Sequence, residues 1–328
     1  MSQMRELGRG GPQVGALGLG AMSFGGMLGP TSEEASFAAM DAAWDIGITH
    51  FDTANVYGPH TSEEVVGRWM KSRGHAPVIA TKAGIQRNPE RPANNEAAHL
   101  EAELDGSLRR LGVDHVALFY IHRREQAIPI EEVAGTMGRL IEAGKIGGWG
   151  LSEVSPTTLR RAHAITPVRA VQNEYSLWTR LPENGVIQEC ERLGVAFVPF
   201  SPLARGVFGR EPIDVEAPDF GDFRRMIPRF HPDNWPANLE KARAFNAYAR
   251  DNGVTAPALA LAWVLAQGDH LIPIPGSRTA DHIRDWAEAV RLTENAELLA
   301  GIDAILPIGW PSGDRYNDAL WRLPEIYS

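Results

Sequence analysis

Residues 48–71 read ITHFDTANVYGPHTSEEVVGRWMK, and this stretch indicates the fold. Residues 48–52 are interpreted as a short strand, and residues 61–71 as a helix. Thr61 and Glu64 are placed as a capping box at the start of that helix. A strand followed by a helix is the building unit of an α/β protein.

The same unit recurs along most of the chain. Strands are expected at residues 17–20, 48–52, 78–82, 116–122, 145–152, 169–172, 195–200 and 271–275. Helices are expected at residues 32–46, 61–71, 131–143, 184–193, 256–267 and 279–290, with one along the stripe Leu100, Leu104, Leu108, Leu111 and one opening at Ser155-Pro156. Eight units favour closure into one (β/α)8 TIM barrel over an open sheet. We therefore predict a single domain over residues 1–328.

Three segments fall outside the repeat. Residues 4–16 are expected to form a β-hairpin, with Gly10-Gly11 as its turn, that plugs the bottom of the barrel. Residues 204–235 are a long irregular stretch, and loops of this length are usually functional or disordered. Residues 308–328 form a C-terminal tail that contains Trp310 and Trp321.

Composition narrows the possible environments and partners. The chain has 328 residues, a net charge of −9 and one cysteine, Cys190, so an intrachain disulfide is impossible. The net charge argues against a nucleic-acid surface. We find no signal-peptide pattern and no apolar run of membrane-helix length. We expect a cytoplasmic protein without a bound metal, in which Cys190 is a packing residue.

Four chemically capable residues follow consecutive predicted strands. Asp52 ends one strand and Tyr57 follows it, Lys82 ends the next strand, and His122 ends the one after. A parallel barrel brings these strand ends to one rim, where its catalytic residues lie. A single Asp or Lys at a strand end is commonly a structural ion pair, and a single His is commonly a core residue. The four together indicate an active site.

These residue types suit the reduction of a carbonyl group. Hydride attack on C=O builds negative charge on the oxygen, which needs a proton donor. Tyr57 is a candidate donor, and an ammonium group at Lys82 would favour its phenolate. Asp52 would pair with Lys82, and His122 would donate a hydrogen bond to the carbonyl oxygen.

In this order, the four residues resemble the catalytic tetrad of the aldo-keto reductase family. The resemblance extends roughly over residues 17–290, through the blocks FDTA at 51–54, YG at 57–58, TK at 81–82, IHR at 121–123, GLS at 150–152, VQNEY at 171–175, PFSPL at 199–203 and IPGSR at 274–278. It implies a barrel enzyme that reduces aldehydes or ketones to alcohols with NADPH.

The resemblance also implies where NADPH would lie across the barrel mouth. Ser152 and Gln172 would hold the carboxamide, and Phe200 would stack under the nicotinamide ring. Arg278 suits the 2′-phosphate, which favours NADPH over NADH. The residues expected to contact the cofactor are Gly20, Met22, Asp52, Ser152, Gln172, Phe200, Ser201, Leu203, Arg205, Gly276, Ser277, Arg278, His282 and Asp285.

The chain departs from the family pattern at two positions. Glu153 stands where the family often has Asn, and a carboxylate can accept from the carboxamide NH₂ but cannot donate to the carboxamide oxygen. Trp286 stands where the family usually has an Asn near the adenine, and stacking could replace that contact. Gly18, Gly20 and Gly25 do not make a dinucleotide fingerprint, because their spacing is wrong.

Loop aromatics are the candidates for a substrate pocket. They are Phe24, Trp178, Phe208, Trp235 and Trp310, together with the apolar Met27, a set that favours an apolar or aromatic carbonyl substrate. The alternative is that they pack on one another. Arg123 and Arg205 would either attract an anionic group or remain solvated charges, and His50 is expected in the core.

Two other functions stay open at this point. A member of this family can act mainly as a cofactor-binding redox sensor or channel subunit with little turnover. A Schiff-base enzyme would instead use Lys82 as a nucleophile, but an ion-paired ammonium is a poor one. The sequence leaves the oligomeric state open.

Overall fold

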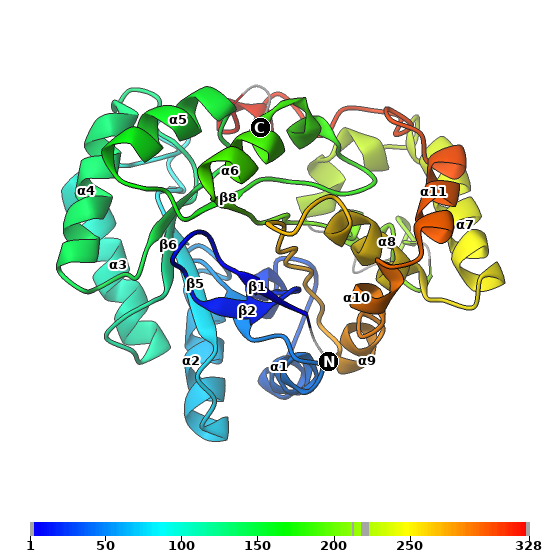
Figure 1. The fold of residues 1–328 in the computed structure, drawn as a ribbon, viewed down its shortest axis with the longest axis horizontal. Coiled ribbons are helices and arrows are strands. Elements are labelled where there is room, and N and C mark those ends of the chain that lie inside the picture. The colour runs from blue at the N-terminus through cyan, green and yellow to red at the C-terminus, as the bar shows by residue number, and fades with distance from the viewer. Residues whose placement is uncertain (1–2, 212, 218–222, 326–328) are drawn as a thin grey trace.

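A parallel sheet forms the centre of the computed structural model, which describes residues 3–211, 213–217 and 223–325. Its seven strands follow one another in space in their chain order (Figure 1). They are β3 (Leu19–Gly20), β4 (His50–Asp52), β5 (Val78–Ala83), β6 (Leu118–Ile121), β7 (Trp149–Ser152), β8 (Ala170–Gln172) and β9 (Ala196–Phe197).

Residues 271–275 take the eighth place and close the ring. Leu271 and Ile274 form parallel bridges to Phe197 and Phe200 on the β9 side. On the other side, the N–H groups of Gly18 and Gly20 donate to the carbonyls of Pro273 and Pro275 at 2.9 and 2.8 Å. The predicted (β/α)8 barrel is therefore confirmed.

The expected hairpin consists of the antiparallel strands β1 (Met4–Glu6) and β2 (Gln13–Gly15). Leu7 and Val14 are fully buried and pack with residues inside the barrel, among them Leu118 and Ile272. The hairpin thus closes the N-terminal end of the barrel, as the sequence predicted.

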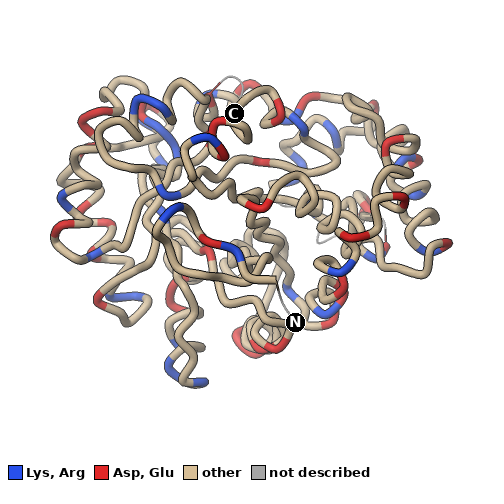
Figure 2. The backbone as a smooth tube through the Cα atoms, in the orientation of Figure 1, with Lys and Arg blue, Asp and Glu red and all other residues tan. Residues whose placement is uncertain are grey.

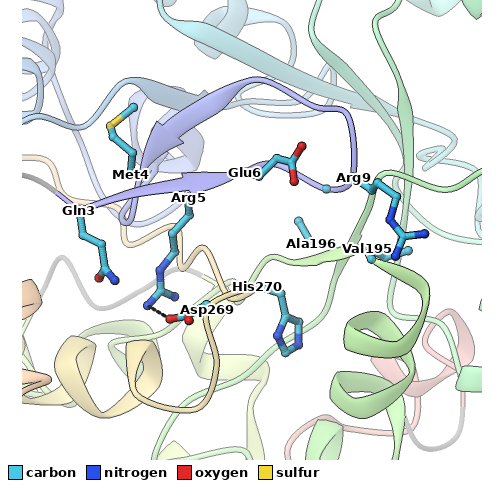
Figure 3. A pocket seen from close by; sticks show the side chains of 11 residues that line it. Gln3, Met4, Arg5, Glu6, Arg9, Val195, Ala196, Asp269 and His270 are labelled. Atoms are coloured by element: carbon cyan, nitrogen blue, oxygen red, sulfur yellow. Dashed lines mark ion pairs between the residues drawn. The ribbon is translucent and has the colours of Figure 1, made fainter.

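A hollow beside the hairpin lies at the same N-terminal end of the strands (Figure 3). Its wall includes Arg5, which is buried and donates to the carbonyls of Leu265 at 3.1 Å and Gly268 at 2.9 Å. Asp269 lies 3.8 Å from the Arg5 guanidinium. Because the N-terminal face of such barrels contributes stability and their chemistry lies at the other end, we assign this contact a structural role.

Helices surround the barrel (Figure 1). They are α1 (Glu33–Asp45), α2 (Thr61–Arg73), α3 (Ala97–Leu111), α4 (Ile130–Glu142), α5 (Pro156–Ile165), α6 (Val186–Leu193), α7 (Trp235–Asp251), α8 (Ala256–Leu265), α9 (Ala280–Arg284), α10 (Ala289–Leu292) and α11 (Ala296–Ile305). Every residue of α8 is buried, because α7, α10 and α11 cover it. The start of α5 is as expected, with Ser155 accepting a hydrogen bond from the Thr158 N–H.

The structure corrects several predicted elements. The capping box at Thr61 and Glu64 is wrong: His60 is the N-cap, with φ 69° and no side-chain cap, and Thr61 Oγ1 donates to the Gly58 carbonyl at 2.5 Å. The predicted helix at 279–290 is divided into α9 and α10. Helices α7 and α11 were not predicted. Much of the buried face of α7 is alanine and asparagine, so its apolar stripe is weak in the sequence.

The irregular stretch at 204–235 contains short 3-10 turns. They are η3 (Ala204–Gly206), η5 (Phe223–Met226) and η6 (Pro228–Phe230), while residues 212 and 218–222 lie outside the described part. Other 3-10 turns are η1 (Ala21–Gly25), η2 (Leu181–Asn184) and η7 (Leu320–Arg322). The tail follows to Glu325, and its last three predicted residues, 326–328, are also outside the described part.

Charge is distributed over the outside of the barrel. Figure 2 shows acidic and basic residues interspersed along the outer helices. No helix among the described residues is both long and apolar enough to cross a membrane. Within the same residues, no group of three or more His, Cys, Asp or Glu side chains is arranged to hold a metal ion.

Candidate active site

The four predicted catalytic residues lie at one rim of the barrel. Asp52 ends β4, Lys82 is the second-to-last residue of β5, and His122 directly follows β6. Tyr57 lies in the turn between β4 and α2, whose N–H groups bond back to this rim: Asn55 N donates to the Lys82 carbonyl at 3.2 Å. Parallel register therefore brings together side chains that are 70 positions apart, between 52 and 122.

The Lys82 ammonium is the centre of the site. It forms an ion pair with Asp52 and donates to the Thr53 carbonyl at 2.9 Å. Its third contact is the Tyr57 hydroxyl, at 3.2 Å. The other carboxylate oxygen of Asp52 accepts from Gln172 Nε2 at 2.8 Å, so both groups of the ion pair are fixed.

Burial shapes the electrostatics of this group. Lys82 is 0% exposed, and burial alone would lower its pKa. Asp52 and Tyr57 outweigh that effect and raise the pKa of Lys82 above its ordinary value. The side chain therefore remains an ammonium, and its charge acts on the tyrosine hydroxyl beside it.

His122 and Tyr57 form the accessible side of the site. Their rings lie edge to face, with centroids 5.7 Å apart, and they are 7% and 9% exposed. Burial lowers the pKa of His122 well below its ordinary value, and the charges of Lys82 and Arg123 lower it further. His122 is therefore a neutral imidazole that can donate one hydrogen bond. Its Nδ1 has no hydrogen-bond partner in the part of the chain that the structure describes.

The residues expected at the nicotinamide end lie at the same rim. Gln172 ends β8 and is bonded to Asp52, and Ser152 ends β7. Ser152 Oγ accepts from Arg123 Nη1 at 2.9 Å. The Arg123 guanidinium also lies 6.0 Å from the centre of the Phe200 ring.

Glu153 is committed to an ion cluster with the C-terminal tail. Its carboxylate accepts from Arg315 at 2.6 Å and from the Glu174 N–H at 2.8 Å. The same Arg315 donates to Glu174 at 3.0 Å, and Arg205 forms a second ion pair with Glu174. All of these side chains are at least nine-tenths buried. Glu153 has φ 58°, a left-handed conformation that this cluster holds in place.

The charge of Glu174 follows from its two arginine partners. Burial would raise the pKa of Glu174, but Arg205 and Arg315 outweigh it and lower that pKa to about 2. The Tyr316 hydroxyl lies 3.3 Å from both guanidinium groups. Glu325 extends the attachment of the tail through Arg124 at 2.5 Å and the Ser155 N–H at 2.9 Å. Sequence reasoning assigned no role to Glu174, Arg315, Tyr316 or Glu325. A single Arg-Tyr pair in a tail gives no pattern from which these ion pairs could have been predicted.

The residues expected at the adenosine end of the cofactor lie within 276–285, directly after the eighth strand position. Arg278 donates to the Pro30 carbonyl at 3.2 Å, and the Ser277 carbonyl accepts from Ser23 at 3.1 Å. Asp285 forms a two-bonded ion pair with Arg210. Of the other residues expected to contact the cofactor, Gly20 ends β3, Met22 lies in η1, Ser201 and Leu203 follow β9, Gly276 follows residues 271–275, and the exposed His282 lies in α9.

Trp286 does not offer a stacking surface. It is 1% exposed and belongs to the main hydrophobic core. The suggestion that it replaces an adenine-binding Asn by stacking is therefore wrong, because a ligand cannot reach a fully buried ring.

Four of the substrate candidates, Trp178, Phe208, Trp235 and Trp310, form one aromatic cluster with Phe230. Trp178 lies 5.8 Å from Phe230 and 5.2 Å from Trp310, and Phe230 lies 5.2 Å from Trp235. Most members are buried, Trp310 only partly, while Phe24 and Met27 belong to the loop after β3. His50 and Cys190 are fully buried, as expected of core residues.

Comparison with known proteins agrees with this architecture. The sequence profile described as "Aldo/keto reductase family" matches residues 16–307. An aldo-keto reductase of Schizosaccharomyces pombe, whose name specifies NADP(+), is 42% identical over 292 residues, which are 86% of each chain. A probable aldo-keto reductase of Glycine max is 38% identical over 98% of this chain and 94% of its own.

A solved structure gives the same result at the level of the fold. A glycerol dehydrogenase from Gluconobacter oxydans superposes with a TM-score of 0.79 and 26% identity, covering 90% of this chain and 93% of that chain. The chain therefore belongs to the aldo/keto reductase family, a family of oxidoreductases.

Proposed function

We propose that this protein reduces aldehydes or ketones to alcohols with NADPH, and that Tyr57 is the general acid. The observation that carries the proposal is the contact between a fully buried lysine ammonium and the Tyr57 hydroxyl, at 3.2 Å. An ammonium in that position stabilises the phenolate that remains when the proton leaves. The name of the Schizosaccharomyces pombe relative supports NADP(H) as the cofactor.

The residues around the rim fit this cofactor. Ser201, Ala204 and Arg205 have φ between 51° and 58°, and left-handed backbone in residues other than glycine is concentrated at functional sites. Arg278, at the far end of the rim, would hold the 2′-phosphate.

The chemistry assigns a separate task to each member of the site. Bound NADPH supplies a hydride to the carbonyl carbon. The Tyr57 hydroxyl gives its proton to the carbonyl oxygen, so that one C–H and one O–H bond form as the C=O double bond becomes single. Lys82 stabilises the phenolate, Asp52 fixes Lys82, and neutral His122 donates a hydrogen bond that orients the carbonyl.

We further propose an apolar or aromatic carbonyl compound as the substrate. The support is the aromatic cluster, which covers the loops beyond β8 and β9 and whose member Trp310 is only partly buried. Trp310 is held in position because its ring N–H donates to the Leu177 carbonyl at 2.7 Å. The exposed part of the Trp310 ring suits a flat, weakly polar molecule, and the buried rings of the cluster support it from behind.

The test is the variant Tyr57→Phe. We expect its turnover of NADPH with an aromatic aldehyde to fall by about 10³-fold, within the range of proton-transfer catalysis, because the ring is kept but the proton is lost. The dissociation constant for NADPH, followed by tryptophan fluorescence, should change little. Tyr248→Phe is the matched control, since the Tyr248 hydroxyl bonds the Leu298 carbonyl at 3.0 Å and belongs to α7. Wild-type turnover in Tyr57→Phe would remove Tyr57 as the acid.

A further inference from the structure

Arg123 lies beside the residues that the proposed function gives to the nicotinamide. It directly follows His122, and one guanidinium nitrogen, Nη1, donates both to the His122 carbonyl at 2.6 Å and to Ser152 Oγ at 2.9 Å. The guanidinium lies 6.0 Å from the Phe200 ring centre. Ser152 and Phe200 are the residues proposed to bind the carboxamide and the ring, so the charge of Arg123 borders both.

Glu153 leaves a gap at this place that Arg123 can fill. A neutral amide at position 153 could donate to the carboxamide oxygen, whereas the Glu153 carboxylate can only accept. The structure also turns that carboxylate away, because Arg315 and the Glu174 N–H bind it. The Arg123 guanidinium has five N–H donors, and it already lies against the hydroxyl of Ser152.

We propose that Arg123 is a cofactor-binding residue that donates to the nicotinamide carboxamide and disfavours the oxidised cofactor. This inference rests on the proposed function, since it needs a nicotinamide at this rim. The oxidised ring carries one positive charge that the reduced ring lacks. The guanidinium next to it therefore repels NADP+ and not NADPH.

The rest of the rim does not cancel this charge. Asp52 forms its ion pair with Lys82, and Glu153 and Glu174 are paired with Arg315 and Arg205. Arg123 itself is bonded to neutral oxygens of His122 and Ser152. We therefore expect the wild-type protein to bind NADPH more tightly than NADP+.

The experiment measures the dissociation constants of NADPH and NADP+ for the wild type and for three variants. Arg123→Gln keeps an N–H donor without the charge, Arg123→Met removes both, and Arg123→Lys keeps the charge. We expect the ratio of the NADP+ constant to the NADPH constant to fall about tenfold in the Gln and Met variants, the size expected of one partly screened charge. The Lys variant should keep most of the ratio. The Met variant should bind NADPH less tightly than the Gln variant, because it has also lost the donor.

Arg124→Gln is the matched control, because the Arg124 guanidinium is bound to Glu325 and Thr158 and is neutralised there. Its ratio should equal that of the wild type. Circular dichroism confirms that each variant is folded. An unchanged ratio in folded Arg123→Gln would overturn the inference and leave the proposed function intact, whereas a wild-type protein that binds neither NADPH nor NADP+ would overturn both.

Discussion

Two buried ion groups lie at the same rim of this barrel, and they differ in what their polar atoms contact. The first, Asp52 with Lys82, reaches the Tyr57 hydroxyl, which lies at the accessible side of the site. The second joins Glu153 and Glu174 to Arg205 and Arg315, and its arginines bind the glutamates and the Tyr316 hydroxyl. The first group can act on a substrate, while the second fastens the tail to the loops after β7 and β8.

The comparison shows that a buried charge does not by itself mark a catalytic residue. Both groups are nine-tenths or more buried, and both contain shifted titratable residues. Each group has a tyrosine hydroxyl beside its charge, but Tyr57 lies at the strand-end rim next to His122, whereas the Tyr316 hydroxyl is bound by two guanidinium groups. The position of the donor at the strand-end rim, rather than the buried ion pair, distinguishes the two groups.

The largest expected effect comes from removing the charge of the first group. Lys82→Met should reduce turnover by about 10³-fold or more, because the phenolate of Tyr57 loses the ammonium group beside it. The measurement is steady-state NADPH oxidation at saturating cofactor, with circular dichroism as the check on folding. Turnover within about threefold of wild type would break the distinction between the two groups.

The corresponding change in the second group should affect stability more than chemistry. Arg315→Met leaves Glu153 and Glu174 short of a buried partner, and we expect the free energy of unfolding to fall by about 3–5 kcal/mol. Urea unfolding measures this loss. In the folded variant the turnover number should remain within about tenfold of wild type, and a loss as large as that of Lys82→Met would show that the tail cluster is catalytic.

The second group should also give the protein an acid-sensitive stability. The pKa of Glu174 is about 2 in the fold and 4.5 ordinarily, so the contribution is complete above pH 4.5 and is lost as the pH falls toward 2. The loss amounts to about 3 kcal/mol. Urea unfolding between pH 7 and pH 3 should show a steeper decline for wild type than for Glu174→Gln, and identical declines would contradict this origin.

The smallest expected effect concerns the choice of cofactor. Arg278→Gln should weaken the binding of NADPH by about tenfold and that of NADH by much less, since only NADPH carries a 2′-phosphate. Fluorescence titration with both cofactors measures the two changes. An equal loss for both would show that Arg278 acts on a part that the two cofactors share.

Sequence reasoning predicted the barrel and the positions of the tetrad for a clear physical reason. Strand ends in a parallel barrel fall on one rim, so Asp52, Lys82 and His122 could be brought together from their places after three predicted strands. The tail contacts could not be predicted in this way. Arg315 reaches Glu153 across 162 positions of sequence, and no periodic pattern links a tail to a strand end.

The same limit explains two residues whose environments were predicted wrongly or incompletely. Glu153 was considered as a carboxamide ligand, but its partner Arg315 comes from the tail. Trp286 was considered as a stacking surface, but the helical segment around it is divided and turns the ring into the core. In both cases tertiary packing decided an environment that local sequence does not encode.

The most direct test of the central claim is a titration of the wild-type protein with NADPH, followed by addition of aromatic aldehydes. Quenching of tryptophan fluorescence reports binding, and loss of nicotinamide absorbance reports hydride transfer. We predict saturable NADPH binding and aldehyde-dependent oxidation that yields the alcohol. Tight binding with no oxidation by any aldehyde or ketone of the panel would contradict the assignment of Tyr57 and Lys82 to catalysis and would point to a cofactor-binding protein without turnover.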